Sequence, residues 1–305
     1  MPPEHGAHYL QNAQIGREWL WILINKRGRN LLQPAGWKTT CAFGCRRKAK
    51  ISPRRRHHLM RLNTDGMVIR EQNIGEADRR VILLTRDYGI VHAFARGARR
   101  IKSNALTATQ LLSYSRFSIF QGRDSYIIDE AEPIEVFFAL RGNMEALSLA
   151  LYFAQLMAEL APELDDAEPY LRLILNTLHL LSSGKRPQLQ LKAIFEMRLL
   201  SIAGYMPNLV ACETCGAFES DPMFFDAVHG RLYCANCRPK GMHDTLPIGI
   251  VTAMRHIVFS DFDKVFHFTL PDDSIRTLAN ISERYLLAQT QRGFQTLDFY
   301  HQVSS

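Results

Sequence analysis

Two pairs of cysteines, each in the pattern C-x-x-C, constrain the fold of this chain more than any other feature. The first pair is Cys212 and Cys215, the second is Cys234 and Cys237, and 18 residues separate the pairs. Four thiols at this spacing can close a tetrahedral all-sulfur site around one Zn²⁺ ion. Because such a site leaves no ligand position for water, we expect a structural zinc and not a catalytic one.

The sequence between the two cysteine pairs fits a small zinc module. Residues 223–226 and 230–233 have the pattern of two short strands joined by a turn at 228–230. Gly216 follows the first pair, where the backbone must turn tightly. A disulfide framework is the alternative, and it fits less well because a chain of 305 residues can bury a core without one.

The positive charge is concentrated at the amino terminus. Residues 1–59 carry 12 Lys and Arg but 2 Asp and Glu, whereas the rest of the chain has a balance of −3. This basic extension is either an arm that grips nucleic acid or a disordered segment upstream of the native start at Met60. We favour the second interpretation. Cys41 and Cys45 lack a second pair nearby, and we interpret them as incidental.

The remaining composition indicates a soluble, cytoplasmic protein. The longest apolar run, residues 19–24, is far shorter than the roughly 20 residues of a membrane span. We also find no signal peptide, no phosphate loop, no H-E-x-x-H, no nucleophile elbow, no dinucleotide fingerprint and no zinc-deaminase motif. We therefore expect no enzymatic activity.

The periodicity predicts an all-β region followed by an all-α region. Five short strands separated by Gly and Asp turns favour a small barrel over a sandwich, which usually has more strands. After them Asn143 is positioned as the N-cap of a first helix, and Gly184 and Gly204 can end later ones. One of these helices carries an apolar stripe of Leu191, Ile194, Phe195, Leu199 and Ile202. The expected strands are 66–70, 80–85, 90–95, 111–120 and 125–129, and the later helices are 169–181, 187–204, 248–259 and 274–292.

A basic segment directly after the third expected strand is the candidate DNA contact. Cations there can neutralise phosphates, and barrels of this kind also stack bases on aromatic side chains. The alternative is an exposed loop that only aids solubility. The candidate cations are Arg96, Arg99, Arg100 and Lys102, with Arg70 and Arg79 as weaker candidates; the aromatic candidates are Tyr88, Phe94, Tyr114, Phe117 and Tyr126.

Several segments in order resemble one bacterial family, the recombination mediator RecO. The resemblance covers about residues 60–300 and does not extend to residues 1–59. The segments that carry it are 75–79 (Gly-Glu-Ala-Asp-Arg), 85–91 (Thr-Arg-Asp-Tyr-Gly-Ile-Val), 95–100 (Ala-Arg-Gly-Ala-Arg-Arg), 195–200 (Phe-Glu-Met-Arg-Leu-Leu), and 204–207 (Gly-Tyr-Met-Pro) leading into 212–216 (Cys-Glu-Thr-Cys-Gly).

The resemblance implies an α+β multidomain fold. An OB-fold barrel at residues 60–137 would precede a helical domain at 138–305, with the zinc module inserted at 212–237. It also implies a non-enzymatic role in DNA repair and homologous recombination. Such a protein binds single- and double-stranded DNA, anneals complementary strands, and works with RecR to load RecA onto DNA coated by single-strand binding protein.

Two rival functions remain open. A zinc-ribbon adaptor would bind protein and not DNA, and a nucleic-acid enzyme would show clustered carboxylates beside the basic loop. Since the chain beyond Met60 is slightly acidic, we expect modest DNA binding with a shallow salt dependence. Lys192, Arg198 and Arg255 are possible contributors to a groove for the acidic tail of single-strand binding protein.

Overall fold

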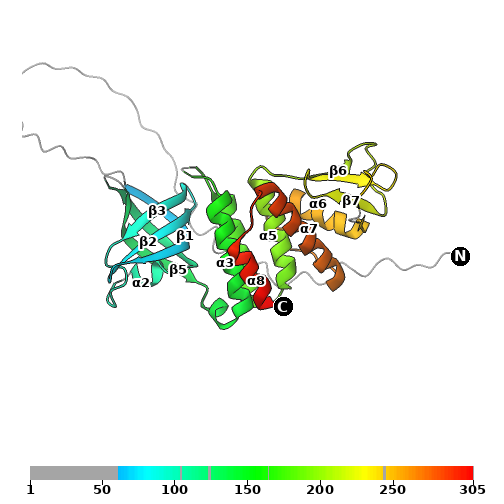
Figure 1. The fold of residues 1–305 in the computed structure, drawn as a ribbon. Helices are drawn as coiled ribbons and strands as arrows, with labels where there is room; N and C mark the ends of the chain where they lie inside the picture. The colour runs from blue at the N-terminus through cyan, green and yellow to red at the C-terminus, as the bar shows by residue number, and fades with distance from the viewer. Residues whose placement is uncertain (1–60, 104, 123–124, 164, 243–244, 305) are drawn as a thin grey trace, which may run out of the picture. The chain divides into compact units, whose positions relative to one another are not determined.

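The computed structural model describes residues 61–304 except residues 104, 123–124, 164 and 243–244 (Figure 1). These residues all belong to one unit of the chain, His57–Ser305. The interpretations of residues 1–59, of Cys41 and Cys45, and of Met60 as a native start lie outside the described residues.

The β-region is a closed five-stranded barrel with the strand order β1-β2-β3-β5-β4. All strand pairs are antiparallel except β3 with β5, so the barrel closes by a parallel contact. This confirms the predicted OB-fold barrel, although the first strand is longer than expected at both ends. The strands are β1 (Arg61–Ile74), β2 (Asp78–Thr85), β3 (Gly89–Ala95), β4 (Ser113–Gln121) and β5 (Tyr126–Val136), and a short helix α2 (Ala105–Ala108) that was not predicted precedes β4.

Alternation along the strands separates the interior of the barrel from its outer side. On β2, Val81 and Leu83 are fully buried in the barrel core, whereas the side chain of Arg80 points to the outer side and is exposed. β1 departs from this rule, because Met67 and Val68 are both fully buried. Val68 faces the barrel core, and Met67 belongs to a second core shared with the helices, so this part of β1 is covered on both faces.

Gly89 joins the barrel to the helical region at very short range. It has a positive φ of 58°, and a Cβ atom there would lie 2.0 Å from the carbonyl oxygen of Pro162. That carbonyl accepts a hydrogen bond from the amide of Ile90, and the amide of Ala167 donates to the carbonyl of Arg86. Only glycine fits both the conformation and the space at this position.

The helices begin and end largely where the capping signals predicted. Asn143 accepts a hydrogen bond from the amide of Ala146 at 3.0 Å and so caps α3, and Gly184 ends α4 in the left-handed conformation. The carboxyl-terminal helix α8 was not predicted. The elements are η1 (Phe138–Gly142), α3 (Met144–Leu160), α4 (Glu168–Ser183), α5 (Gln188–Ile202), α6 (Ile248–Phe259), α7 (Asp272–Thr290) and α8 (Gln295–Ser304).

Helix α5 lies at the centre of the helical region (Figure 1). It packs against α3, α4, α6 and α7, and the predicted stripe residues are buried apart from Ile202, which is half-buried. The polar side of α5 is buried as well, including Lys192 and Glu196. A helix covered on all sides must pair any charge that it carries, because an isolated charge is costly to remove from water.

The cysteine-rich segment forms a four-stranded sheet with the order β6-β8-β7-β9. The predicted hairpin is present as β7 (Met223–Asp226) and β8 (Arg231–Cys234). Two strands that were not predicted, β6 (Asn208–Cys212) and β9 (Thr245–Leu246), border it on either side. Among the described residues, none of the helices is both long and apolar enough to cross a membrane.

Candidate metal centre and nucleic-acid interface

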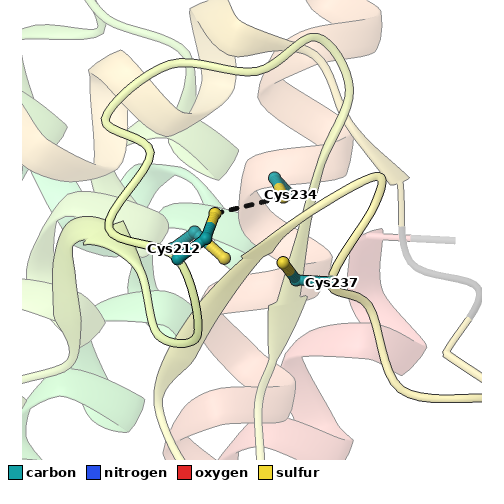
Figure 2. Close-up of side chains that lie close together, drawn as sticks. Cys212, Cys234 and Cys237 are labelled. Atoms are coloured by element: carbon teal, nitrogen blue, oxygen red, sulfur yellow. Dashed lines mark hydrogen bonds between the residues drawn. The ribbon is translucent and has the colours of Figure 1, made fainter.

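The four predicted cysteines converge in the zinc module. Cys212 ends β6 and Cys234 ends β8, while Cys215 and Cys237 lie in the turns that follow these strands. All four sulfur atoms lie within 4.8 Å of one another. Figure 2 shows the side chains of Cys212, Cys234 and Cys237 turned toward a common centre. The sequence therefore predicted this cluster correctly, and its residues could hold a metal ion.

The distances between sulfur atoms suit a tetrahedral metal site. Sγ of Cys215 lies 3.7 Å from Sγ of Cys234. In a tetrahedral site with zinc–sulfur bonds of about 2.3 Å, neighbouring sulfurs are about 3.8 Å apart. All four cysteines are free thiols, so the structure contradicts the alternative in which disulfides join them.

The backbone around Cys212 favours its thiolate form. Burial raises the pKa of the Cys212 thiol, but the amides of Cys215, Cys234 and Thr214 outweigh burial and lower that pKa to about 6. Hydrogen bonding to Cys234 and Cys215 raises the pKa of Cys237 to about 12. Four thiols this close cannot all ionise unless a cation lies between them, and a bound dication supplies that charge.

The basic loop after β3 is anchored by its backbone and exposes its cations. The amide of Gly97 donates to Asp78 at 2.7 Å, and the amide of Arg99 donates to the carbonyl of Ala77 at 2.9 Å. Ala98 is fully buried, so the loop is fixed at its base. Within the described part of the chain, Arg96, Arg100 and Lys102 are exposed and have neither an ion pair nor a hydrogen bond through their side chains.

Two predicted cations differ from the other four. Arg99 is half-buried and donates to the carbonyl of Gly75 at 3.0 Å, so its guanidinium is partly engaged. Arg79 is 6% exposed, and its guanidinium donates to Thr109 at 3.0 Å and to the carbonyl of Leu106 at 3.3 Å. A side chain held inside the barrel cannot reach a phosphate, so we remove Arg79 from the candidate interface. Arg70 is exposed on β1.

Sequence reasoning missed Arg80 and His92, which lie on the outer side of the barrel with Arg70. Across β1, β2 and β3, the strand register places Gln72, Arg80 and Phe94 in one row. The adjacent row on the same side of the sheet contains Arg70, Ile82 and His92. Paired residues of antiparallel strands face the same side of a sheet. The period of two in the sequence around Arg80 and His92 could have identified both residues. We call the exposed cations Arg70, Arg80, Arg96, Arg100 and Lys102 the basic face.

Two other cations of the barrel, Arg116 and Arg61, are paired with carboxylates. Arg116 on β4 forms ion pairs with Asp65 at 3.3 Å and with Glu132 at 3.4 Å. Arg61 on β1 forms an ion pair with Asp129 at 3.0 Å. Among the described residues of the barrel, the exposed cations without an ion pair or a side-chain hydrogen bond are therefore Arg70 on β1 and Arg96, Arg100 and Lys102 in the loop after β3, with Arg80 on β2 over the ring of Phe94.

The three cations suggested for the tail of single-strand binding protein have structural partners. Lys192 is 1% exposed and paired with Glu196 and Glu283. Arg198 donates to the carbonyls of Ile257 and Val258 near the end of α6. Arg255 donates to the carbonyls of Leu209, Val210 and Phe218, and it stacks 4.0 Å from the ring of Phe218. The suggestion therefore fails for Lys192, which is buried with its carboxylate partners, while Arg198 and Arg255 are engaged in holding α6 and β6.

The fold and the site define a multidomain protein in which an OB-fold barrel precedes a helical region with a four-cysteine cluster. Barrels of this fold recur among proteins that bind oligonucleotides and oligosaccharides. Family models for the amino-terminal and carboxyl-terminal parts of recombination protein O match residues 60–137 and 141–298. The chain belongs to the recombination protein O (RecO) family.

Relatives named DNA repair protein RecO are similar over most of their length. The protein of Acetivibrio thermocellus is 35% identical over 240 residues, which are 78% of this chain and 95% of the relative. That of Symbiobacterium thermophilum is 34% identical over 248 residues, 80% of this chain and 98% of the relative. That of Alkaliphilus metalliredigens is 29% identical over 250 residues, 80% of this chain and 100% of the relative.

Proposed function

We propose that this protein is a DNA repair and homologous recombination mediator that binds DNA and anneals complementary single strands. The observation that carries the proposal is the basic face, in which Arg80 lies over the half-buried ring of Phe94 on an OB-fold barrel of the RecO family. Arg96, Arg100 and Lys102 neutralise backbone phosphates, with Arg70 and Arg80 beside them and Arg99 at the edge. Binding of this kind tolerates any sequence, as annealing requires.

The protein acts through binding energy and not through catalysis. Annealing needs two strands held near each other with their bases available, and this requires no bond cleavage. Within the described residues, two carboxylates of β1 and β2 are engaged: Asp78 accepts from the amide of Gly97, and Glu71 accepts from the amide of Leu111 and pairs with Arg79. No carboxylate cluster of the kind that a nuclease uses faces these cations in that part of the chain.

The metal in the four-cysteine cluster is one structural Zn²⁺. The ligand set is all sulfur, which is typical of closed zinc sites without a position for water. Zinc would join β6 to β8 and so fix the module that Arg255 ties to α6.

The proposed partners follow from the RecO family. They are single- and double-stranded DNA, RecR, single-strand binding protein and, through loading onto coated strands, RecA. The site of action is the cytoplasm, at the nucleoid during repair. The division into a DNA-binding domain at 60–137 and a helical domain at 138–305 is part of this proposal.

The salt dependence of DNA binding tests the basic face. We expect Arg96→Ala/Arg100→Ala/Lys102→Ala to weaken binding of a single strand and to reduce the slope of log K against log salt by about 2, at about 0.7 per lost phosphate contact. Arg116→Ala is the matched control, because this exposed arginine is already paired with Asp65 and Glu132. An unchanged slope in the triple variant would remove these residues from the interface.

Annealing of strands coated by single-strand binding protein tests the mediator role. We expect acceleration without ATP by the chain from Met60 onward, and weaker acceleration as salt rises. Activity of the full chain alone would instead assign DNA binding to residues 1–59. Inactivity of both chains would favour the protein-binding adaptor.

A further inference from the structure

A hollow of about 360 Å³ lies on the barrel beside the basic face. Its volume lies within the range of roughly 300–1,000 Å³ that is usual for small-molecule and cofactor sites. β2 supplies Arg80, β3 supplies His92 and Phe94, and the other lining residues come from the end of β4, the start of β5 and the described residues between them. The described residues that line it are Arg80, His92, Phe94, Gln121, Gly122, Ser125 and Tyr126.

The central feature of this hollow is the pair of Arg80 and Phe94. These residues are register partners on β2 and β3, and the guanidinium of Arg80 lies 5.2 Å from the centre of the Phe94 ring. Phe94 is half-exposed on the outer side of the barrel, so its ring is not needed to fill the barrel core. An aromatic ring and a guanidinium plane are both surfaces on which nucleobases stack.

The other side chains in the hollow suit a base and not an aliphatic ligand. Tyr126 packs against the barrel core, which holds its ring in place. His92 and Gln121 are exposed, and within the described residues their side chains have no hydrogen-bond partner. They can therefore meet the polar edge of a base, whose donors and acceptors differ from one base to the next.

The hollow shares one residue, Arg80, with the basic face. Arg96 follows Phe94 by two residues and is the first residue after the end of β3. The Arg70–Ile82–His92 row adjoins the Arg80–Phe94 pair across the sheet. A strand whose phosphates lie on Arg96 and Arg100 would have a neighbouring base within reach of Phe94.

We propose that this hollow is a base-stacking subsite for single-stranded DNA, in which an unpaired nucleobase stacks on Phe94 and Arg80. This inference rests on the proposed DNA-binding function and deepens it. A base in a duplex is already stacked and paired, so the subsite favours single strands over double strands. Stacking also tolerates all four bases, because every base has a π-face.

The test compares two strands of equal charge, using the full-length protein. One probe is a fluorescently labelled oligothymidylate, and the other is an abasic strand with the same number of phosphates. We expect the wild type to bind the oligothymidylate more tightly. Phe94→Leu should weaken that binding roughly 5- to 140-fold, the usual effect of losing one stacked aromatic side chain. Its affinity for the abasic strand and its salt slope should not change.

Two further variants separate stacking from general effects. Phe94→Trp keeps an aromatic face and should preserve the preference for bases. Phe138→Leu is the matched control, because Phe138 on η1 is exposed and has Arg141 over its ring at the same 5.2 Å, but lies outside the basic face. It should leave both affinities unchanged. A strand containing 2-aminopurine should lose fluorescence on binding the wild type, and this quenching should be absent with Phe94→Leu.

The outcomes distinguish the subsite from the function on which it rests. If the wild type binds both strands equally, or if Phe94→Leu weakens both to the same extent, DNA binding stands and the stacking subsite is overturned. If the wild type binds neither strand, the proposed DNA-binding function itself fails.

Discussion

Lys192 and Glu196 lie one turn apart on α5, with Nζ and Oε1 2.8 Å apart and both side chains buried. Oε1 of Glu196 also accepts from the hydroxyl of Tyr152 at 2.8 Å, and Oε2 accepts from Ser282 at 2.6 Å. Lys192 additionally pairs with Glu283 on α7 at 2.7 Å. A single buried network therefore joins α3, α5 and α7.

The first prediction concerns the loss of one partner of this pair. Lys192→Met leaves the Glu196 carboxyl buried without its cation, so we expect the free energy of unfolding to fall by about 3–5 kcal/mol. The double variant Lys192→Met/Glu196→Gln should lose less free energy of unfolding than the sum of the losses in the two single variants. Urea unfolding of the four proteins gives the coupling. Lys264→Met is the control, because its exposed pair with Asp261 should contribute less than about 1 kcal/mol. Additive single effects would show that the pair is not coupled.

The second prediction concerns the pH dependence of Glu283. Burial raises the pKa of this carboxyl, but Lys192 and then His301 outweigh burial and lower the pKa below its ordinary value of 4.5. A lowered pKa in the folded state stabilises the protein above pH 4.5, and this stabilisation is lost as the pH falls through the folded-state pKa. At neutral pH, Glu283→Gln should therefore reduce the free energy of unfolding by about 1.5–3 kcal/mol.

The measurement is urea unfolding of the wild type and Glu283→Gln at several pH values. The difference between the two proteins should shrink below pH 4.5. A difference that stays constant or grows on acidification would contradict the assignment.

The third prediction concerns metal removal. We expect one zinc ion per chain, and its removal by a chelator should expose the amides of the β6–β9 sheet to hydrogen exchange because zinc binding and local folding are coupled. The barrel should keep its protection and its DNA affinity, since the basic face contains no residue of the module. Cys215→Ser should lose the metal, whereas Cys41→Ser should retain it. Equal zinc content in the two variants would exclude the four-cysteine site.

The fourth prediction separates two adjacent arginines on β2. Arg79→Met removes a buried guanidinium from Thr109 and Leu106, and we expect a loss of about 1.5–3 kcal/mol in unfolding free energy with an unchanged salt slope of DNA binding. Arg80→Met should alter stability by less than about 0.5 kcal/mol, because it is an exposed position. It should instead weaken DNA binding. Urea unfolding and DNA titration of both variants give the comparison, and the reverse pattern would restore Arg79 to the interface.

The cysteine spacing and the strand and helix periods determined much of this fold. Cys212, Cys215, Cys234 and Cys237 could be identified because a metal site depends on local spacing, and Asn143 and Gly184 because caps act within one turn. The strand β6 and the helix α8 were missed, since short elements of this kind form mainly through contacts with distant parts of the chain.

The role of each cation was decided by the tertiary structure alone. The sequence shows Arg79, Arg80, Arg198 and Arg255 as equivalent positive charges. The fold places Arg80 on the outer side of the barrel, whereas the guanidinium of Arg79 donates to Thr109. The guanidinium of Arg255 donates to the carbonyls of Leu209, Val210 and Phe218. A long cationic side chain is buried where distant residues supply acceptors for its charge, and no local pattern records which cations have them.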